Sequence, residues 1–377
     1  MDPWSGEQQL EAFSCRCAEE GYVGCVCFGS APGCLDATDA DASLRLWEVG
    51  GFGLDTVVAR PQTRIDLPRV IPVVDESSAR QGVLRPAVAV GLQAWPDSIG
   101  ASAHRAESLA ERLRLPQHLK TVLVPFASDV DLERLWIGRH QGVRHLAQLR
   151  PDLVVVPSFS QWDGDPRAEQ QYARKRCFEF YRFLQNHGQA AVVHVDWSSQ
   201  ADAQELCSWL DQNEVDWIVV DAQCLASSAD RWLAQLAWVK SRLTAPPNLL
   251  ASGLHSAKHL TQLVRTWPNM SVIYNGLPLA RSHRELALRP DGSTARLRYG
   301  PPTERSALID LGRDPEPATL YRHSIRTLER IIANALTLTL PPINADLSGR
   351  GGQPVTPRPI VRPTRVRGSK PARTAAR

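Results

Sequence analysis

Eight short apolar runs recur along the chain, and polar or amphipathic segments separate them. The runs lie at residues 69–75, 86–92, 121–127, 153–160, 190–197, 217–223, 248–253 and 271–276. They are rich in Val, Ile and Leu and mostly apolar at consecutive positions, which is typical of parallel strands that are buried on both faces. The pattern therefore predicts eight parallel β-strands.

The segments between the runs have the periodicity of amphipathic helices, with apolar residues three and four positions apart. These segments lie at residues 103–115, 129–149, 166–188, 200–213, 229–243 and 256–267, and residues 318–338 form a last one. Only the link after the first run is short and lacks a clear helical pattern. The chain is thus expected to alternate strands and helices.

The number of alternations favours an α/β fold, a (β/α)₈ TIM-like barrel over residues 65–340, a stretch of the usual length for that fold. An open, doubly wound sheet is the alternative. The sequence has no G-x-G-x-x-G after its first strand and no Walker motif, which excludes only the common nucleotide-binding forms of that sheet. We predict a Cys-rich extension at residues 1–64, the barrel, and a disordered basic tail at residues 341–377.

Composition supports a large core in a protein without membrane segments. Of the 377 residues, 43% are hydrophobic and 22% are charged, which is typical of a globular chain that buries a sizeable core. The first residues are acidic and polar, unlike a secretory signal, and nowhere do about eighteen apolar residues follow one another. We therefore expect a cytoplasmic protein that does not bind membranes.

The charge is unevenly distributed, because residues 349–377 contain eight Lys or Arg and no Asp or Glu. Removing these eight charges from the total of +3 leaves −5 for the rest of the chain. The tail is rich in Pro, Arg and Gly and lacks apolar periodicity, so we expect it to be disordered. It could bind DNA or RNA by displacing counterions from phosphates. A solubilising tail without a dedicated partner is the other interpretation.

Five of the eight cysteines lie close together near the start of the chain. They are Cys15, Cys17, Cys25, Cys27 and Cys34. Two Cys-x-Cys pairs and a fifth thiol, separated by Gly, Pro and Ser, could supply four thiolates to zinc or to an iron–sulfur cluster. The spacing differs from the common Cys-x-x-Cys knuckle. Disulfides or redox-active thiols are the alternative, which a cytosolic location makes less favourable.

The run AVVHVDW at residues 191–197 carries two titratable groups on one side of a strand. Side chains alternate across a strand, so Val192, His194 and Asp196 share one face. Burial of a charged group in the apolar layer between strands and helices is costly. We therefore expect His194 and Asp196 to face the barrel interior near its C-terminal mouth, where such barrels assemble their active sites.

Polar residues lie at the C-terminal ends of at least four of the eight runs, and the N-terminal ends show nothing comparable. We predict that His194 and Asp196 exchange protons, and that Asp221 and Ser160 orient the substrate. Each residue also has a structural interpretation. An Asp after a strand often caps the next helix, and a single His is often a core residue whose hydrogen bonds are satisfied.

A second group of residues near the strand ends is expected to bind the substrate. Its members are Asp75, Ser158, Trp162, Trp197, His255, Lys258, Tyr274 and Arg281. Aromatic rings beside strand ends could stack on a base or a sugar, or simply cover the rim. Barrels often bind phosphate at the loops after the seventh and eighth strands, where this chain has Lys258 and Arg281. Lys and Arg are also common on surface helices.

Residues 129–197 carry motifs that resemble a known family. VVVPSFSQWDGDP, QQYARKRCFEFYRFLQNHG and VVHVDW are similar to segments of the bacterial and mobile-element family catalogued as domain of unknown function 4417. The resemblance implies a phage or plasmid context but no reaction, because the family is uncharacterised. The family pattern has an acidic residue before Phe-Ser, whereas this chain has Ser158. The role of that carboxylate therefore cannot be carried over, and Asp163 or Asp196 are the substitutes.

The combined pattern predicts a hydrolase or a transferase of the glycosyl or transglycosylase type, with a phosphorylated small molecule or a nucleotide bound at the mouth. Barrel enzymes that exchange nucleic-acid bases also pair an acidic mouth with a zinc site, but this analogy rests on the fold alone. The alternative is a nucleic-acid-binding accessory protein of a phage or plasmid. In that case the tail and the cysteines bind the partner, and the barrel is a scaffold.

Overall fold

The computed structural model describes ten stretches of the chain. They are residues 48–60, 64–80, 82, 85–91, 108–125, 129–159, 167–222, 229–253, 257–275 and 317–337. All these residues belong to one compact unit, Asp2–Thr339. The predictions for the N-terminal cysteines and the basic tail lie outside the described residues.

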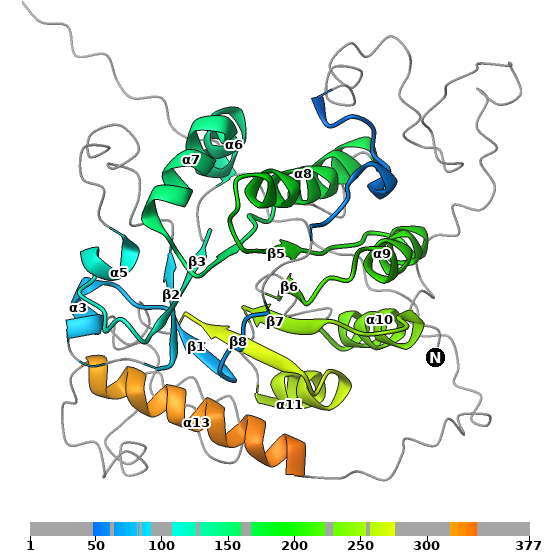
Figure 1. Cartoon of the computed structure of the whole chain (residues 1–377). Helices are drawn as coiled ribbons and strands as arrows, with labels where there is room; N and C mark the ends of the chain where they lie inside the picture. The colour runs from blue at the N-terminus through cyan, green and yellow to red at the C-terminus, as the bar shows by residue number, and fades with distance from the viewer. Residues whose placement is uncertain are drawn as a thin grey trace, which may run out of the picture. The chain divides into compact units, whose positions relative to one another are not determined.

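Eight parallel strands form the barrel that the sequence predicts (Figure 1). They are β1 (Val70–Pro72), β2 (Ala87–Gly91), β3 (Lys120–Val124), β4 (Leu153–Val155), β5 (Ala191–His194), β6 (Trp217–Asp221), β7 (Asn248–Ser252) and β8 (Met270–Tyr274). Their order is β1-β8-β7-β6-β5-β4-β3-β2. At the two ends of this order, Val73 bridges to Ala89, and the Val74 N–H donates to the Ala89 carbonyl at 2.8 Å. The sheet is thus a nearly closed (β/α)₈ TIM-like barrel, and each predicted run overlaps one strand.

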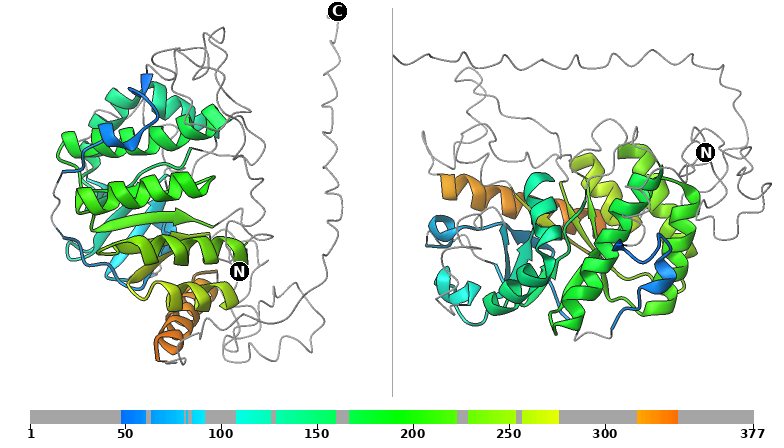
Figure 2. Two further views of the ribbon diagram at one scale, coloured as in Figure 1. Left: turned by 90° about the vertical axis from the view of Figure 1, so that its right-hand side faces the viewer. Right: turned by 90° about the horizontal axis from the view of Figure 1, so that it is seen from above.

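Helices surround the strands on the outside (Figures 1 and 2). The described helices are α3 (Glu76–Arg80), α5 (Leu109–Arg112), α6 (Asp129–Ile137), α7 (Arg139–Leu149), α8 (Arg167–Asn186), α9 (Gln200–Asn213), α10 (Ala229–Arg242), α11 (Ala257–Thr266) and α13 (Pro317–Thr337). Two differences from the sequence prediction stand out. The long helix expected at residues 129–149 is divided at Gly138, and the link after β1 holds a short helix, α3.

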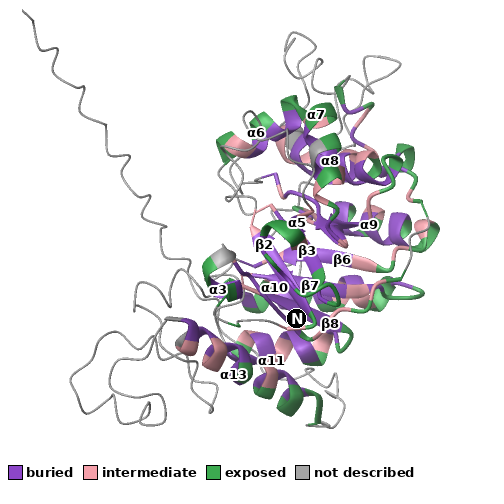
Figure 3. Ribbon diagram, turned by 60° about the vertical axis from the view of Figure 1, so that its left-hand side comes forward, coloured by how far each residue is buried: buried purple, intermediate pink, exposed green. Residues whose placement is uncertain are grey.

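Two apolar cores lie on opposite faces of the strands. The inner core fills the barrel with alternate strand residues: Ile71, Val73, Ala87, Ala89, Val122, Val124, Leu153, Val155, Val192, Val219, Leu250 and Ile273. The outer core contains the intervening residues, such as Val193 and Val195 of β5 and its extension, packed with helix side chains. Figure 3 shows the strands mostly buried. The face that carries Val192 is therefore the inner one, as the alternation predicts.

Residues 48–60, which we call the strap, lie along α8 and α9. Val49, Phe52, Leu54 and Val57 of the strap are buried in the outer core. The strap's hydrogen bonds include Tyr172 Oη to Glu48 (2.6 Å), Leu54 N to Glu205 (2.8 Å), Trp209 Nε1 to Val57 O (2.6 Å), Ala59 N to Asn213 (2.7 Å) and Gln185 Nε2 to Arg60 O (3.0 Å).

The direction of the strap follows from these partners. Both helices begin at the mouth, because each follows the C-terminal end of a strand, and both end at the bottom of the barrel. Glu48 contacts the first third of α8, whereas Ala59 and Arg60 contact the last residues of α9 and α8. The strap therefore runs from the mouth to the bottom, and residues that we assigned to the N-terminal extension are part of the barrel's outer core.

Candidate functional site

The C-terminal ends of β5 and β6 bring together three titratable residues, His194, Asp196 and Asp221, which we call the mouth cluster. His194 lies on the inner face of β5, two residues after Val192, and its exposed fraction is 5%. Asp221 ends the neighbouring strand β6, and its charge acts on both His194 and Asp196. Strand alternation thus places the predicted catalytic residues of these two strands at one end of the barrel.

His194 is buried without satisfied hydrogen bonds. Neither ring nitrogen has a hydrogen-bond partner among the described residues, and both atoms are shielded from solvent. Burial lowers the pKa of His194 from 6.5 to about 4, and the charge of Asp221 opposes this shift. The imidazole is therefore neutral at pH 7, with one donor and one acceptor nitrogen. A buried polar atom without a partner costs about 1–3 kcal/mol, so a bound ligand that pairs with these nitrogens would recover stability.

Asp196 lies two residues after β5. The residue is partly exposed, but its surroundings desolvate the carboxyl group. The Trp197 N–H donates to Asp196 Oδ1 at 2.8 Å. Burial raises the pKa of Asp196 from 3.8 to about 6, the Trp197 N–H and Arg174 lower it, and the charges of Asp202 and Asp221 raise it. The carboxyl group is therefore present in both protonation states just below neutral pH, which suits a residue that carries protons.

A third strand end contributes a hydroxyl group that the sequence prediction did not include. Ser252 ends β7 opposite Asp221 in the register of β6 and β7, and its exposed fraction is 3%. Leu250 of the same strand belongs to the inner core, so alternation places Ser252 on the inner face as well. This alternation was visible in the run NLLAS and could have identified the residue.

Asp75 and Ser158 are described, and they lie at other strand ends. Asp75 Oδ1 accepts hydrogen bonds from the backbone N–H and from the hydroxyl of Ser78, both at 2.9 Å. These contacts cap α3 and match the structural interpretation of an Asp after a strand. They also explain why the link after β1 forms a short helix. Ser158 lies three residues beyond β4 and is partly exposed.

Two of the aromatic residues expected to bind the substrate pack into the helix layer. Trp197 belongs to the outer core, and its Nε1 donates to Gln235 Oε1 at 3.2 Å. Tyr274 follows the inner residue Ile273, packs against the outer core, and stacks on Tyr321 of α13 with the ring centres 5.5 Å apart. Their contacts are those of structural residues between the barrel and its helices.

The remaining predicted site residues divide into one described cation and a set outside the described residues. Lys258, in the first turn of α11 beyond β7, is exposed and forms an ion pair with Asp230 at 3.2 Å. The undescribed residues are Ser160, Trp162, His255, Arg281, Cys15, Cys17, Cys25, Cys27 and Cys34. Across the stretches that are described, no group of three or more His, Cys, Asp or Glu side chains could hold a metal ion.

Two buried arginines lie in the first half of α8, in the helix layer near the mouth. The sequence prediction did not include them. Arg176 Nη1 donates to both carboxylate oxygens of Glu133, at 2.7 and 2.8 Å, and the Arg176 guanidinium lies 4.1 Å from the ring centre of Phe159. Arg174 is paired with Asp202 and Glu205 of α9. A buried cation in water-poor surroundings needs such partners. The run ARKR offered a signal, because consecutive residues 100° apart on a helix cannot all face solvent.

Cys177 of α8 is a buried free thiol near the mouth. Burial raises the pKa of the Cys177 thiol to about 12, with a backbone hydrogen bond from Phe159 and the charge of Arg176 opposing the shift. The thiol is therefore protonated at neutral pH, and such a group is a poor nucleophile.

The N-terminal ends of the strands, which form the bottom of the barrel, correct one sequence prediction. They do carry polar groups, but these groups have partners. The Thr121 hydroxyl donates to Asp152 Oδ2 at 3.0 Å, and Trp217 Nε1 donates to the Ile65 carbonyl at 3.0 Å. Asn248 Nδ2 donates to the Asp216 carbonyl at 3.1 Å. The two ends thus differ in the unpaired nitrogens of His194 and not in the presence of polar residues.

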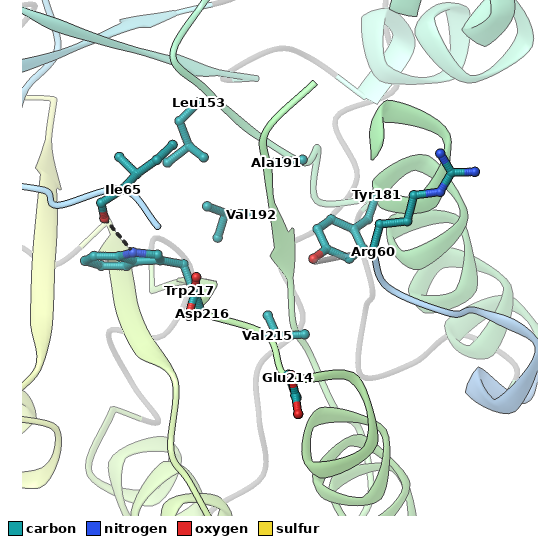
Figure 4. Close-up of a pocket in the computed structure, with 10 residues that line it drawn as sticks. All are labelled: Arg60, Ile65, Leu153, Tyr181, Ala191, Val192, Glu214, Val215, Asp216 and Trp217. Carbon is teal, nitrogen blue, oxygen red and sulfur yellow. Dashed lines mark hydrogen bonds between the residues drawn. The ribbon is translucent and has the colours of Figure 1, made fainter. Parts of the chain in front are cut away.

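A shallow pocket also lies at the bottom, beneath β4, β5 and β6 (Figure 4). It contains about 370 Å³ of space between atoms, part of it open to solvent, and the first residues of the three strands line it. Arg60 and Ile65 form part of its wall, and the hydrogen bond from Trp217 to Ile65 lies beside it. It opens on the face opposite to the mouth cluster.

Comparisons with known proteins found no match, either among protein-family models or among curated proteins. The resemblance to domain of unknown function 4417 therefore stays a prediction. None of the helices within the described stretches is both long enough and apolar enough to cross a membrane.

Proposed function

We propose that the mouth of the barrel is an active site for acid–base chemistry on a phosphorylated or nucleotide-like ligand, in a hydrolase or a glycosyl-type transferase. The observation that carries the proposal is the pair of buried, unpartnered nitrogens of His194, near the charge of Asp221 and on the same strand face as Asp196. Unsatisfied buried polar groups of this kind are rare in proteins and cluster at functional sites.

The pKa values of Asp196 and His194 suggest different roles for these two residues. Asp196, with a pKa of about 6, is the proton carrier: it donates a proton to a leaving group when protonated and takes one from an attacking hydroxyl when ionised. His194, whose pKa of about 4 makes it a weak base, orients the ligand through hydrogen bonds as a neutral imidazole. Asp221 orients a ligand hydroxyl or amine and favours positive charge as it develops.

The charges of the mouth cluster also suggest how the ligand is oriented. Two carboxyl groups repel a phosphate, so the sugar or base would enter the sector of β5 and β6. The phosphate would bind farther along, at the loops after β7 and β8, where barrels of this kind often bind phosphate and where Lys258 contributes a positive charge. Ser160 and Arg281 keep their predicted roles in substrate orientation and phosphate binding.

The test uses nucleoside 5′-monophosphates and ribose 5-phosphate as probes, with calorimetry for binding and chromatography for release of the free base. We expect Asp196→Asn to lower turnover at least about 100-fold, the usual contribution of a positioned acid or base. The matched control is Asp216→Asn, because Asp216 precedes β6 at the bottom, whereas Asp221 ends the same strand at the mouth. Binding and turnover that are equal in Asp196→Asn, Asp221→Asn and the control would contradict the proposal.

The second candidate function is that of a nucleic-acid-binding accessory protein, and the basic tail favours it. Eight positive charges without an acidic residue in residues 349–377 would give binding that weakens steeply with salt. Deletion of this tail would then abolish binding to a DNA or RNA duplex, whereas Asp196→Asn would have no effect. The reverse pattern favours the enzyme.

A further inference from the structure

Asp202 is a buried carboxylate surrounded by donors. It is the third residue of α9 and its exposed fraction is 2%. Its Oδ2 accepts hydrogen bonds from the N–H of Ser198 at 3.1 Å, the hydroxyl of Ser198 at 3.0 Å and the N–H of Ser199 at 3.1 Å. Its Oδ1 faces Arg174 Nη1 at 3.4 Å. Since every neighbour in these contacts donates, only a side chain with two acceptor oxygens satisfies them all.

Arg174 connects this carboxylate to α8. Its side chain is 4% exposed; Nη2 donates to the carbonyl of Asp202 at 3.1 Å, and Nη1 donates to Glu205 Oε2 at 2.6 Å. Glu205 also accepts the N–H of Leu54 in the strap at 2.8 Å. One guanidinium therefore ties together α8, the first turn of α9 and the strap, and both ends of the Arg174–Asp202 pair are held by further hydrogen bonds.

The loop that Asp202 holds is the one that carries Asp196. Ser198 and Ser199 lie two and three residues after Asp196, between β5 and α9. We propose that Arg174 and Asp202 are positioning residues, which fix the loop after β5 and thereby keep the Asp196 carboxyl group in its water-poor place at the mouth. This inference rests on the proposed function for the role of Asp196 as proton carrier, but the contacts that it uses do not depend on that role.

The charges around Asp196 give the expected direction. The titratable groups that interact with it are Asp202 of α9, Arg174 and Cys177 of α8, and Asp221 of β6. Burial and the charge of Asp202 raise the pKa of Asp196, whereas Arg174 lowers it. Replacing Asp202 by Asn removes one of the raising charges, leaves Arg174 less compensated, and frees the loop so that water reaches the carboxyl group. All three changes lower the pKa of Asp196.

The experiment compares Asp202→Asn with Glu133→Gln. Both substitutions remove a carboxylate from a buried arginine of α8, but Glu133 pairs with Arg176 and is not a partner of the loop after β5. Carbon-13 NMR of the side-chain carboxyl groups follows the titration of Asp196, and hydrogen exchange follows the amides of Ser198 and Ser199. We expect Asp202→Asn to move the Asp196 midpoint down by about one pH unit and to speed exchange of both amides, whereas Glu133→Gln changes neither.

A purely structural role would lower stability in both variants and leave the Asp196 midpoint in place, and that result would overturn the inference. If Asp202→Asn does not fold, Asp202→Glu keeps the charge but displaces it by one methylene. It is expected to speed exchange of the two serine amides and lower the Asp196 midpoint, and an unchanged loop and midpoint would again overturn the inference. No substrate is needed, so the positioning pair can hold even if Asp196 carries no proton in catalysis.

Discussion

At the bottom of the barrel the Thr121 hydroxyl donates to Asp152 at 3.0 Å, whereas at the mouth neither nitrogen of His194 has a hydrogen-bond partner among the described residues. Both side chains are buried, with exposed fractions of 1% and 5%. The bottom therefore satisfies a polar group that it buries. The mouth leaves one unsatisfied, at the strand end that also carries Asp196, whose pKa burial raises to about 6. The unpaired nitrogens at the mouth are what supports the proposed ligand site there, whereas the paired groups at the bottom stabilise the fold.

The largest effect that tests this comparison is the pH dependence of stability at the mouth. Asp196 has a pKa of about 6 in the folded chain against 3.8, so its contribution to stability is complete below about pH 3.8 and is lost as the pH rises through 6. His194 has a pKa of about 4 against 6.5, so its contribution is present above about pH 6.5 and is lost as the pH falls through 4. Between about pH 4 and 6, Asp196 makes the free energy of unfolding fall with pH and His194 makes it rise. The two effects nearly cancel.

Replacing either residue removes its pH-dependent contribution to stability and reveals that of the other. Relative to the unsubstituted chain, we expect Asp196→Asn to gain stability as the pH rises from 4 to 6.5, and His194→Gln to lose it. Each change amounts to about 3 kcal/mol over the window, because one pKa unit corresponds to about 1.4 kcal/mol. Urea unfolding between pH 4 and 7 measures both, and curves parallel to that of the unsubstituted chain would mean that the two groups are not desolvated.

We expect a smaller change in stability when a paired polar group at the bottom of the barrel is removed. Asp152→Ala removes the acceptor for the N–H and the hydroxyl of buried Thr121, and we expect the free energy of unfolding to fall by about 2 kcal/mol. Asp216→Ala is the control, because Asp216 is exposed and also lies directly before a strand. Its change should stay within about 0.5 kcal/mol. Equal losses in the two variants would show that the paired polar groups do not stabilise the bottom.

The smallest effect concerns strain where helices end at the bottom. Glu214 follows α9 with φ of 47°, in the left-handed region that favours glycine, and Gly188 follows α8 with φ of 73°. We expect Glu214→Gly to raise the unfolding free energy by about 0.5–1 kcal/mol and Gly188→Ala to lower it by about 1 kcal/mol. Thermal unfolding of the two variants measures this, and a loss of stability in Glu214→Gly would mean that the side chain makes contacts that outweigh the strain.

The barrel could be predicted from the sequence because parallel strands buried on both faces leave long apolar runs. The start of α9 was equally visible, since Ser199 and Asp202 form a capping box around its first turn. The break between α6 and α7 could not be predicted, because Gly138 lies inside a continuous helical pattern of apolar residues. The strap was missed because its apolar residues follow no helical or strand period and contact helices more than 100 residues away in sequence.

The site could be predicted in part. Alternation placed His194 on the inner face, and the same rule put Tyr274 on the outer face beside Tyr321. What the sequence did not reveal is which polar groups have partners: Asp75 caps α3, whereas His194 has no partner among the described residues. The buried pair of Arg174 and Asp202 depends on two helices that meet in space, and a charged residue on an amphipathic helix normally indicates a solvent-facing side.

The strap has a practical consequence for anyone who modifies this chain. The first strand enters the barrel from below, yet the strap returns the preceding chain to the upper end, where Glu48 is held by Tyr172 at 2.6 Å and by Arg139 at 3.2 Å. A fluorophore or cross-linker joined just ahead of Glu48 would start out near the opening and close enough to report on a molecule that enters it.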